Sequence, residues 1–313
     1  MTTVGVLLPR DLPIEQLRPY ARRAEALGFA ELWVVEDLPF RGGIAQAAIA
    51  LAETSRIRVG VGILPAAVRN PAFAAMEAST LAELFPGRLD LGVGHGMPSW
   101  IRQVGAWPAS PLSLLEEHVT ALRALLRGES VTVDGRYVTL DGVALSSPPT
   151  VVPRVLAGVR GPRSLELAGR VSDGVVLAEP VTPEYLADVL AHLGRRDLPV
   201  VAYCVAAVDD DADAARALVR PALEWIGEPD WEPHIAPLPF ADEFRALRAG
   251  TANRTAFVDG MPDAWIDQLA VVGTPEGARA QIARLHDAGA TSVVLIPAGH
   301  DPLAALESLS RVL

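Results

Sequence analysis

A glycine-rich turn at residues 158–163 carries the clearest ligand-binding pattern in this sequence. It follows a short apolar run at residues 155–157 and precedes a segment whose apolar residues recur at helical spacing. This order predicts a strand–turn–helix unit of a parallel sheet. Pro162 stands at the expected first position of the helix, where its missing N–H costs nothing. The turn therefore lies where the strand ends and the helix begins.

The residue types in this turn suit an anion. Gly158 and Gly161 let the backbone approach a ligand closely, and the unpaired N–H groups of a helix start attract negative charge. Arg160 and Arg163 are able to add bidentate contacts to a phosphate. The same spacing is compatible with a tight turn whose arginines lie in solvent, because a two-glycine loop is a weak signal.

An acidic pair, Glu36 and Asp37, follows another apolar run at residues 31–35. Adjacent carboxylates push each other's pKa values apart, which suits acid–base catalysis, and they accept hydrogen bonds from the N–H groups of a cofactor. The alternatives are a solvated loop and an ion pair with Arg41.

His95 lies in a glycine-rich stretch at residues 92–100, at the end of a further apolar run. The glycines leave room for a flat ligand, and a histidine in this place can donate or shuttle a proton near neutral pH. A histidine that is bonded only to the backbone is the competing interpretation.

Metal and thiol chemistry find no support in the pattern. No two of the six histidines form a His-x-His pair, and Pro9 and Arg10 end the first apolar run, where metal hydrolases of the barrel fold place such a pair. Cys204 is the only cysteine and lies within an apolar run, which excludes a disulfide within the chain. Three tryptophans are interpreted as core residues: Trp225, Trp231 and Trp265.

Strand-like runs alternate with helical ones along the chain. The eight runs lie at residues 4–8, 31–35, 57–64, 88–94, 155–157, 174–177, 200–208 and 292–296. Eight repeats predict an α/β fold, a (β/α)8 TIM barrel, rather than an open sheet. Active sites of this fold lie at the carboxyl ends of the strands, so the acidic pair, His95 and the turn are expected to meet there. Glu179, just after the sixth run, is a further candidate for this end.

We expect one domain over residues 1–313, with two insertions. Residues 98–150 contain a predicted helix at 113–126 and a hairpin that turns at Asp134 and Gly135. Residues 209–272 are helical in pattern and rich in proline, which indicates an elaborated crossover between the seventh and eighth strands.

Composition narrows the class of protein. A net charge of −11 argues against nucleic acid or a membrane surface as partner, so a small-molecule substrate is expected. All basic residues are arginine, and the absence of lysine excludes Schiff-base aldolases, pyridoxal-phosphate enzymes and P-loop NTPases. No apolar run approaches the ~20 residues that span a bilayer, and the N-terminus lacks a signal-peptide pattern. A cytoplasmic protein is expected.

Five motifs fall in order over nearly the whole chain. They are Ala26-Leu-Gly-Phe-Ala-Glu-Leu-Trp-Val-Val-Glu-Asp37, Ile57-Arg-Val-Gly-Val-Gly-Ile-Leu64 with Arg69-Asn-Pro71, Pro86-Gly-Arg-Leu-Asp-Leu-Gly-Val-Gly-His95, Ala157-Gly-Val-Arg-Gly-Pro-Arg-Ser-Leu-Glu-Leu-Ala-Gly-Arg-Val-Ser-Asp-Gly174 and Val272-Gly-Thr-Pro-Glu276. Together they resemble the bacterial luciferase-like monooxygenase superfamily, in particular its branch of oxidoreductases that use the deazaflavin coenzyme F420, such as proteins similar to methylenetetrahydromethanopterin reductase. The family fold is a TIM barrel with an insertion after the fourth strand, in agreement with the alternation described above.

The resemblance implies roles for individual residues. The turn would be the family's phosphate loop, with Arg160 beside the residues that hold the cofactor phosphate: Gly158, Val159, Gly161, Pro162 and Arg163. Gly62 and Ile63 fall where the family often has a bulge with a non-proline cis peptide behind the deazaflavin ring. The substrate pocket would be lined by Phe40, Ile63, Leu64, Met97, Trp100 and Trp107.

Two positions depart from the family pattern. Members commonly show Asp-His after the second strand, where this chain has Glu36 and Asp37. Many place a proton-donating carboxylate just after the fourth strand, where this chain has Met97. His95 and the acidic pair are then the candidates for proton delivery.

These observations predict an F420-dependent oxidoreductase that moves a hydride between the deazaflavin and a small organic substrate. An FMN-dependent monooxygenase of the same superfamily, supplied by a partner flavin reductase, is the alternative. A non-catalytic flavin or deazaflavin carrier is a third hypothesis. Arginines near the expected cavity mouth favour F420, whose polyanionic tail needs more cationic contacts. A homodimer is usual for relatives and is expected here.

Overall fold

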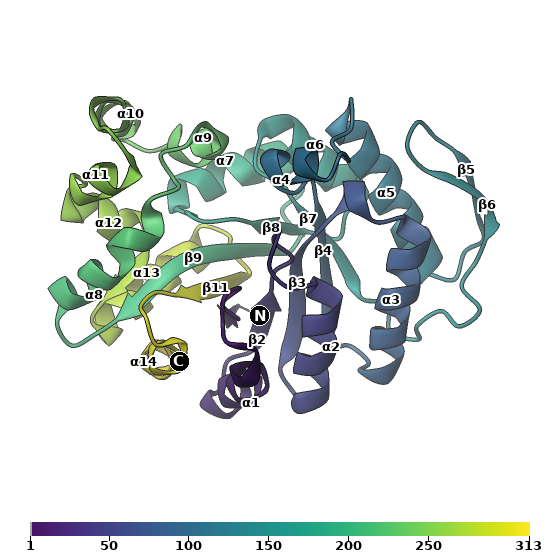
Figure 1. Ribbon diagram of the computed structural model, residues 1–313, viewed down its shortest axis with the longest axis horizontal. Helices are drawn as coiled ribbons and strands as arrows, with labels where there is room; N and C mark the ends of the chain where they lie inside the picture. Colours follow the sequence, from purple (N-terminus) through teal and green to yellow (C-terminus); the bar gives the residue numbers. More distant parts are fainter. Residues whose placement is uncertain (1) are drawn as a thin grey trace.

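Eight parallel strands close into a barrel in the computed structural model, which describes residues 2–313 (Figure 1). They are β1 (Thr3–Leu7), β2 (Glu31–Val34), β3 (Arg58–Pro65), β4 (Leu89–Gly94), β7 (Arg154–Gly158), β8 (Val175–Leu177), β9 (Val200–Val208) and β11 (Ser292–Pro297). Neighbours follow the chain order from β1 to β9, β11 pairs with both β9 and β1, and the β8–β9 pairing completes the ring. The predicted TIM barrel is confirmed.

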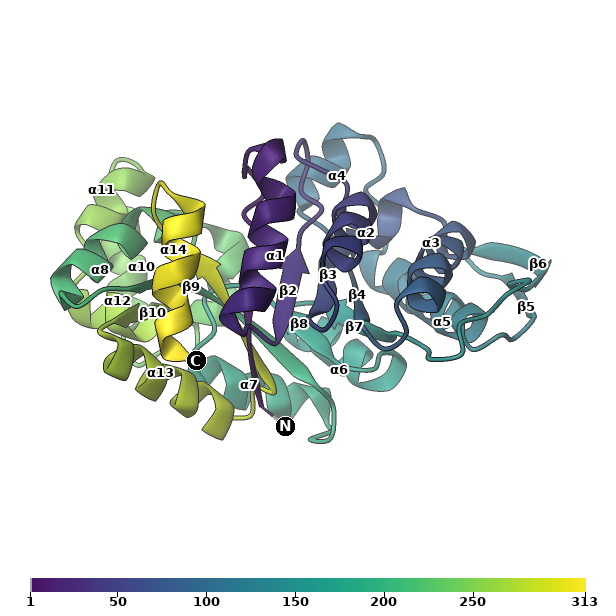
Figure 2. The same ribbon diagram turned by 90° about the horizontal axis from the view of Figure 1, so that it is seen from below.

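Helices cover the outer surface of the barrel. They are α1 (Leu17–Leu27), α2 (Gly43–Glu53), α3 (Pro71–Leu84), α5 (Pro111–Leu126), α6 (Pro162–Val171), α7 (Pro183–Leu193), α13 (Pro275–Asp287) and α14 (Pro302–Leu309). From below, α14, α1, α2 and α3 stand side by side (Figure 2), and consecutive helices in this row are in contact. Proline opens several of them, and Asn70 caps α3 by accepting a hydrogen bond from the Ala72 amide at 2.9 Å.

The first insertion lies between β4 and β7. It contains the short helix α4 (Pro98–Gln103), then α5, and then a hairpin of β5 (Val131–Asp134) and β6 (Thr139–Val143). The hairpin lies at one end of the molecule beyond α5, on the right of Figure 1. The expected hairpin at Asp134 and Gly135 is therefore present.

The second insertion lies between β9 and β11 and forms a helical group at the opposite end of the molecule (Figure 1). It contains α8 (Ala212–Val219), α9 (Glu232–Ile235), α10 (Ala241–Gly250), α11 (Arg254–Asp259), α12 (Asp263–Leu269) and the strand β10 (Val271–Gly273). The sequence pattern missed β10. This strand pairs with the far end of β9, because β9 is nine residues long and offers a free edge beyond its barrel neighbours.

Short 3-10 turns complete the chain. They are η1 (Ile14–Gln16), η2 (Ala66–Val68), η3 (Arg220–Leu223), η4 (Pro229–Trp231) and η5 (Ser310–Val312). None of the helices formed by residues 2–313 is both long enough and apolar enough to cross a membrane.

A cluster of apolar side chains fills the barrel interior. It is separate from the larger core between the strands and the surrounding helices. Its members are Leu7, Trp33, Leu156, Val176, Val201, Tyr203 and Val294. Trp33 and Tyr203 meet edge to face, with ring centroids 5.8 Å apart. A Cβ at Gly60 would lie 2.3 Å from the Trp33 ring, so this position of β3 has space only for glycine. These side chains form a solid floor below the carboxyl ends of the strands.

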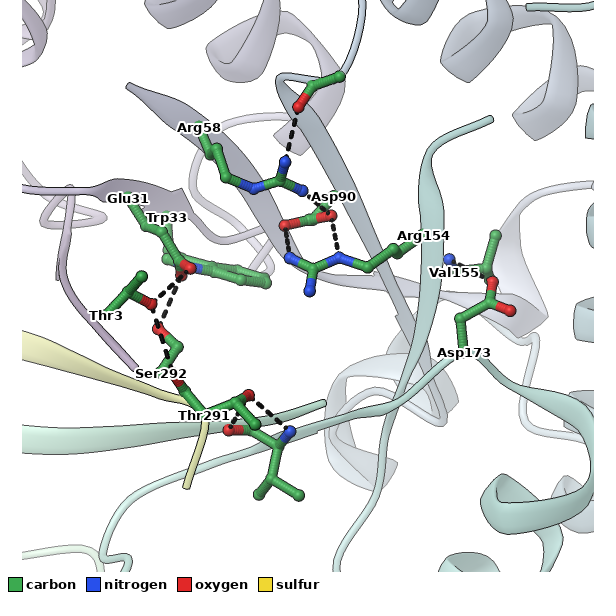
Figure 3. A network of polar contacts seen from close by, with 12 residues as sticks. Thr3, Glu31, Trp33, Arg58, Asp90, Arg154, Val155, Asp173, Thr291 and Ser292 are labelled. Carbon is green, nitrogen blue, oxygen red and sulfur yellow. Dashed lines mark hydrogen bonds and ion pairs between the residues drawn. The ribbon is translucent and has the colours of Figure 1, made fainter. Parts of the chain in front are cut away.

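Polar networks close the amino end of the barrel (Figure 3). Asp90 is 1% exposed and accepts hydrogen bonds from Arg58 Nη2 at 2.6 Å and Arg154 Nε at 2.8 Å. A second buried carboxylate, Glu31, accepts from Thr3 Oγ1 at 2.9 Å, Trp33 Nε1 at 2.8 Å and Ser292 Oγ at 2.8 Å. Buried carboxylates supplied with this many donors stabilise the closed end and are not available for a ligand.

Candidate functional site

A cavity of about 1520 Å³ opens at the carboxyl ends of the strands. The segments that follow β1, β2, β3, β4, β7, β8 and β9 contribute to its wall, as does the end of β11 itself. Pockets for one small ligand typically measure about 300–1,000 Å³, so this cavity has room for a cofactor ring and a second molecule. Fourteen site candidates from the sequence line it: Glu36, Asp37, Phe40, Gly62, Ile63, His95, Met97, Trp100, Trp107, Gly158, Val159, Arg160, Gly161 and Glu179.

A bulge in β3 shapes the floor of this cavity. The register between β3 and β4 shifts between Val61 and Leu64, and the Gly62–Ile63 peptide is cis, as the resemblance implied. Ile63 turns inward and lines the cavity. A Cβ at Gly158 would lie 2.4 Å from Ile63 Cγ2, so β7 approaches the bulge closely.

The prediction that Leu64 lines the substrate pocket is wrong. Leu64 is buried in the layer between the barrel and its helices, as is Val61. In a regular strand residues three apart face opposite sides, but the bulge inserts an extra residue and turns both side chains outward. The cavity therefore receives Ile63 in place of Leu64.

The turn after β7 presents open backbone to the cavity. Gly161 is the N-cap of α6, and no side chain in residues 2–313 caps this helix start. A Cβ built on Gly161 meets no atom of the described chain within 4 Å. Pro162 and Arg163 are exposed and lie outside the cavity wall, so the wall is made here by Gly158, Val159, Arg160 and Gly161.

Arg160 is held within the protein and does not extend into solvent. Its guanidinium lies 4.6 Å above the Trp231 ring, and its Nη1 donates to the main-chain oxygen of Asp230 at 3.1 Å. The main-chain oxygen of Arg160 accepts from Tyr185 Oη at 2.9 Å. The turn is thereby joined to the second insertion, and a positive charge is fixed at the cavity wall.

Each carboxylate of the acidic pair bonds a different arginine: Glu36 bonds Arg69, and Asp37 bonds Arg10. The ion pair with Arg41 that the sequence allowed is not formed. Glu36 accepts from Arg69 Nη1 at 2.8 Å and from the Gly43 amide at the start of α2, also at 2.8 Å. Asp37 accepts from Arg10 Nη1 at 3.0 Å. Burial raises the pKa of Asp37, and the hydrogen bond and charge of Arg10 oppose that rise. Glu36 is thus bound into the loop after β2, whereas Asp37 is held by one exposed arginine.

His95 lies half-buried at the end of β4, with its Nε2 3.1 Å from Ser164 Oγ in the first turn of α6. Burial lowers the pKa of His95, so its imidazole is neutral near pH 7. The structure therefore brings His95 to the same wall as the turn after β7.

Three further residues at the cavity were given no site role from the sequence. Trp225 is 43% exposed and lines the cavity, so its interpretation as a core residue is wrong, while the core placement of Trp265 against Phe240 is confirmed. Trp231 is buried and also lines the cavity. Tyr203 lies within an entirely apolar strand, which carries no signal for a site, and its position beside the bulge follows only from barrel closure.

Glu179, which the sequence offered as a candidate for this end of the barrel, also belongs to the cavity wall. It follows β8 and lines the cavity, as its position after the sixth strand-like run allowed. Burial raises the pKa of Glu179. Among residues 2–313, no group of three or more His, Cys, Asp and Glu side chains is placed to hold a metal ion.

The chain is similar to known proteins over almost its whole length. A family model described as luciferase-like monooxygenase matches residues 2–292. A 5,10-methylenetetrahydromethanopterin reductase from Methanolobus tindarius is 32% identical over 307 residues, which is 93% of each chain. An F420-dependent glucose-6-phosphate dehydrogenase from Nakamurella multipartita is 32% identical over 187 residues, 56% of this chain and 55% of the relative. The solved structure of a coenzyme F420 dependent tetrahydromethanopterin reductase from Methanopyrus kandleri matches with a TM-score of 0.85 at 22% identity, covering 100% of this chain and 98% of that one.

Proposed function

Since the chain belongs to the luciferase-like monooxygenase family, we propose that it is an oxidoreductase that uses coenzyme F420. Its reaction is a hydride transfer between the deazaflavin and a small organic substrate. One observation carries the proposal: a large cavity lies between the Gly62–Ile63 bulge and the uncapped start of α6, in a chain related over 93% of its length to a reductase. Relatives named for F420 support this cofactor.

The residues of the cavity wall fit such a cofactor. Gly161 leaves open space at the start of α6, and Arg160 places a cation beside it, a combination that suits a phosphate. Gly158 and Val159 complete this loop, and Gly62 and Ile63 would support the ring. Pro162 fixes the start of α6, and Arg163 adds positive charge on its exposed face.

The chain's own groups orient the reactants and handle protons, while the bound cofactor supplies the hydride chemistry. Neutral His95, bonded to Ser164, is able to donate or relay a proton at the cavity wall. Asp37 lines the same cavity with Arg10 as its partner. Glu36 is a positioning residue. Its carboxylate bonds both Arg69 and the start of α2, and so fixes the loop that carries Asp37.

The substrate end of the cavity is apolar. The large apolar side chains that line it are those of Phe40, Met97, Trp100, Trp107 and Trp225. Apolar walls exclude water and strengthen electrostatic interactions with the reacting groups. An organic substrate with an apolar body fits this surface.

We keep the FMN-dependent monooxygenase, with a separate flavin reductase as partner, as the second candidate. Three arginines on the cavity wall, Arg10, Arg41 and Arg160, favour the polyanionic F420 over FMN. A non-catalytic carrier is the third candidate. It is disfavoured because the cavity contains acidic groups, Asp37 and Glu179, that are suited to proton transfer.

We further propose that the chain acts as one domain and as a cytoplasmic homodimer. Both insertions pack against barrel elements, α5 on β4 and β7 and α8 on β9, which supports a single unit. A row of exposed apolar side chains on α3 supports a partner surface: Phe73 is 64% exposed, Met76 54% and Leu84 66%.

Cofactor titration tests the proposed function. Adding the purified chain to F420 is expected to quench the cofactor fluorescence to saturation, while FMN at the same concentrations gives a weaker response. Arg160→Gln is expected to weaken F420 binding about tenfold or more, because a charge-assisted hydrogen bond to phosphate contributes about 1.5–3 kcal/mol. Glu166→Gln on the exposed face of α6 is the control. Preferential binding of FMN would favour the monooxygenase, and binding of neither cofactor would refute the proposal.

A further inference from the structure

Glu179 stands on the cavity wall directly after β8, in a backbone position fixed by the second insertion. Its main-chain oxygen accepts a hydrogen bond from Trp231 Nε1 at 2.9 Å. Trp231 in turn lies under the Arg160 guanidinium. The side chain of Glu179 lines the same cavity as Ile63 and His95. The backbone of Glu179 is thus fixed beside the ligand space.

The carboxyl group of Glu179 has no bonding partner from another residue. Of the three acids that follow β2 and β8 in the cavity, Glu36 is bound by Arg69 and the Gly43 amide, and Asp37 is bound by Arg10. No other residue in the described part of the chain hydrogen-bonds the Glu179 carboxyl group, which is approached only by its own amide. Glu179 is half-buried on the cavity wall, so a hydrogen bond with a ligand at this place would give its carboxyl group a partner.

Charged and titratable groups surround Glu179 from several strands. Arg160 after β7 and Arg10 after β1 are cationic, and Asp37 after β2 is anionic. Tyr203 and Cys204 of β9 lie next to it, and both have raised pKa values to which the charge of Glu179 contributes. Burial is the largest influence and raises the pKa of Glu179; the two arginines and its own amide lower it, and Asp37 raises it. The carboxyl group therefore retains its proton to a higher pH than an exposed glutamic acid does.

We propose that Glu179 is the proton donor for a ketone or aldehyde that is reduced in this cavity. The inference rests on the proposed function, in which reduced F420 is the reductant. It assigns the acid to β8, since the segment after β4 offers Met97 and no carboxyl group at the corresponding place. Glu36 is less suited, because its carboxylate is bonded to Arg69 and to the Gly43 amide, which stabilise the charged form. Asp37, bonded to Arg10, is the alternative acid that the D37N variant tests.

The step balances without any further reactant. The two electrons of the hydride form the new C–H bond, and the π pair of the carbonyl group moves onto its oxygen. The Glu179 O–H bond breaks, and its proton forms the O–H bond of the alcohol product. Glu179 is left as a carboxylate and regains a proton from water, and the deazaflavin is left oxidised.

The protonation state of Glu179 is tested without cofactor or turnover. Infrared spectra of the whole chain with isotope-labelled glutamate are compared for wild type, E179Q and E166Q near neutral pH. Wild type and E166Q are expected to show the band of a protonated carboxyl group, and E179Q to lack it. A wild type without this band, or an E179Q variant that retains it, would overturn the proposal.

Its role in the reaction is tested with F420 and a panel of ketones and aldehydes. Loss of a general acid lowers kcat about 100-fold or more, so E179Q is expected to lose this much while its affinity for F420 stays that of wild type. The wild-type rate falls as pH rises through the pKa of Glu179, and this fall is absent in E179Q. Turnover of E179Q equal to wild type would overturn the assignment.

Two controls separate this inference from the alternatives. E179D retains a carboxyl group, so it keeps part of the rate and the fall in rate at high pH, whereas a merely structural role predicts equal loss in E179D and E179Q. D37N retains the fall in rate at high pH; if D37N abolishes that fall, Asp37 is the acid and the proposal fails. Absence of F420 binding in wild type would refute the proposed function, while the infrared band would still decide the state of Glu179.

Discussion

Polar side chains at the cavity divide into those already bound within the protein and those that face the ligand space. Glu36 belongs to the first kind, since Arg69 and the start of α2 occupy its carboxylate. Glu179 belongs to the second, because no other residue of the described chain bonds its carboxyl group. The distinction depends on partners rather than on residue type, and it separates positioning roles from reactive ones.

A buried histidine near Arg69, the partner of Glu36, makes the stability of the chain depend on pH. His118 of α5 is 2% exposed, and burial together with the nearby charge of Arg69 lowers its pKa to about 4. Above pH 6.5 His118 is neutral in both the folded and the unfolded chain. Between pH 6.5 and 4 the unfolded chain binds a proton at His118 that the folded chain does not, so the free energy of unfolding falls as pH falls.

We expect His118→Gln to remove that pH dependence. Between pH 6 and 5 the wild-type free energy of unfolding should fall by roughly 1 kcal/mol more than that of the variant, by linkage to one proton. Urea denaturation at each pH measures the difference. His286→Gln, at a half-buried histidine of α13, is the matched control for the substitution itself. Parallel pH profiles for wild type and His118→Gln would contradict this account.

At the scale of elements, the close approach of β3 and β7 builds the cavity floor. The bulge at Gly62 and Ile63 directs Ile63 inward, and β7 passes so near that a Cβ on Gly158 would overlap Ile63 Cγ2. Gly161 differs, since its missing side chain leaves open space at the start of α6. The two glycines of the turn thus serve separate purposes, one in packing and the other at the ligand.

Alanine at these two glycines should therefore give different results. Gly158→Ala is expected to displace Ile63, lower the free energy of unfolding by about 1–3 kcal/mol and weaken F420 binding. Gly161→Ala is expected to leave stability within about 0.5 kcal/mol of wild type and weaken only F420 binding, because its methyl group enters the ligand space. Thermal melting and fluorescence titration measure the two effects. Equal stability of both variants would show that the Gly158 contact is not tight.

The whole molecule is a cylinder with one closed end and one open end. Asp90 and Glu31 lie in hydrogen-bonded networks at the amino ends of the strands (Figure 3). The aromatic pair of Trp33 and Tyr203 fills the barrel interior. The opposite end is covered by loops that leave the cavity. Stability and ligand binding are therefore assigned to opposite ends, as the barrel fold favours.

The exposed face of α3 leads to a prediction about assembly. Phe73→Asp is expected to convert the proposed homodimer to a monomer, because a charge at the centre of an apolar interface loses its hydration. Light scattering measures the mass in solution. Leu218→Asp on α8, at the other end of the molecule in Figure 1, is a matched exposed control that should stay dimeric. A wild type that is monomeric at all concentrations would refute the homodimer.

The sequence by itself determined the order of the strands, the barrel and most of the cavity wall. Alternating apolar runs specify parallel strands, and in a barrel their carboxyl ends share one rim, so Asp37, His95 and Gly161 could be placed together before any coordinates. This works because hydrophobic period and turn residues are local properties of the chain.

Only the tertiary structure decided how individual side chains are used. Leu64 faces the helices because a bulge changed the side of the strand, and Trp225 reaches the cavity because the second insertion folds back over the rim. Which carboxyl group is bound by an arginine and which remains free, as for Glu36 and Glu179, depends on residues distant in sequence. Such partners meet only when the barrel closes, and for that reason no local pattern encodes them.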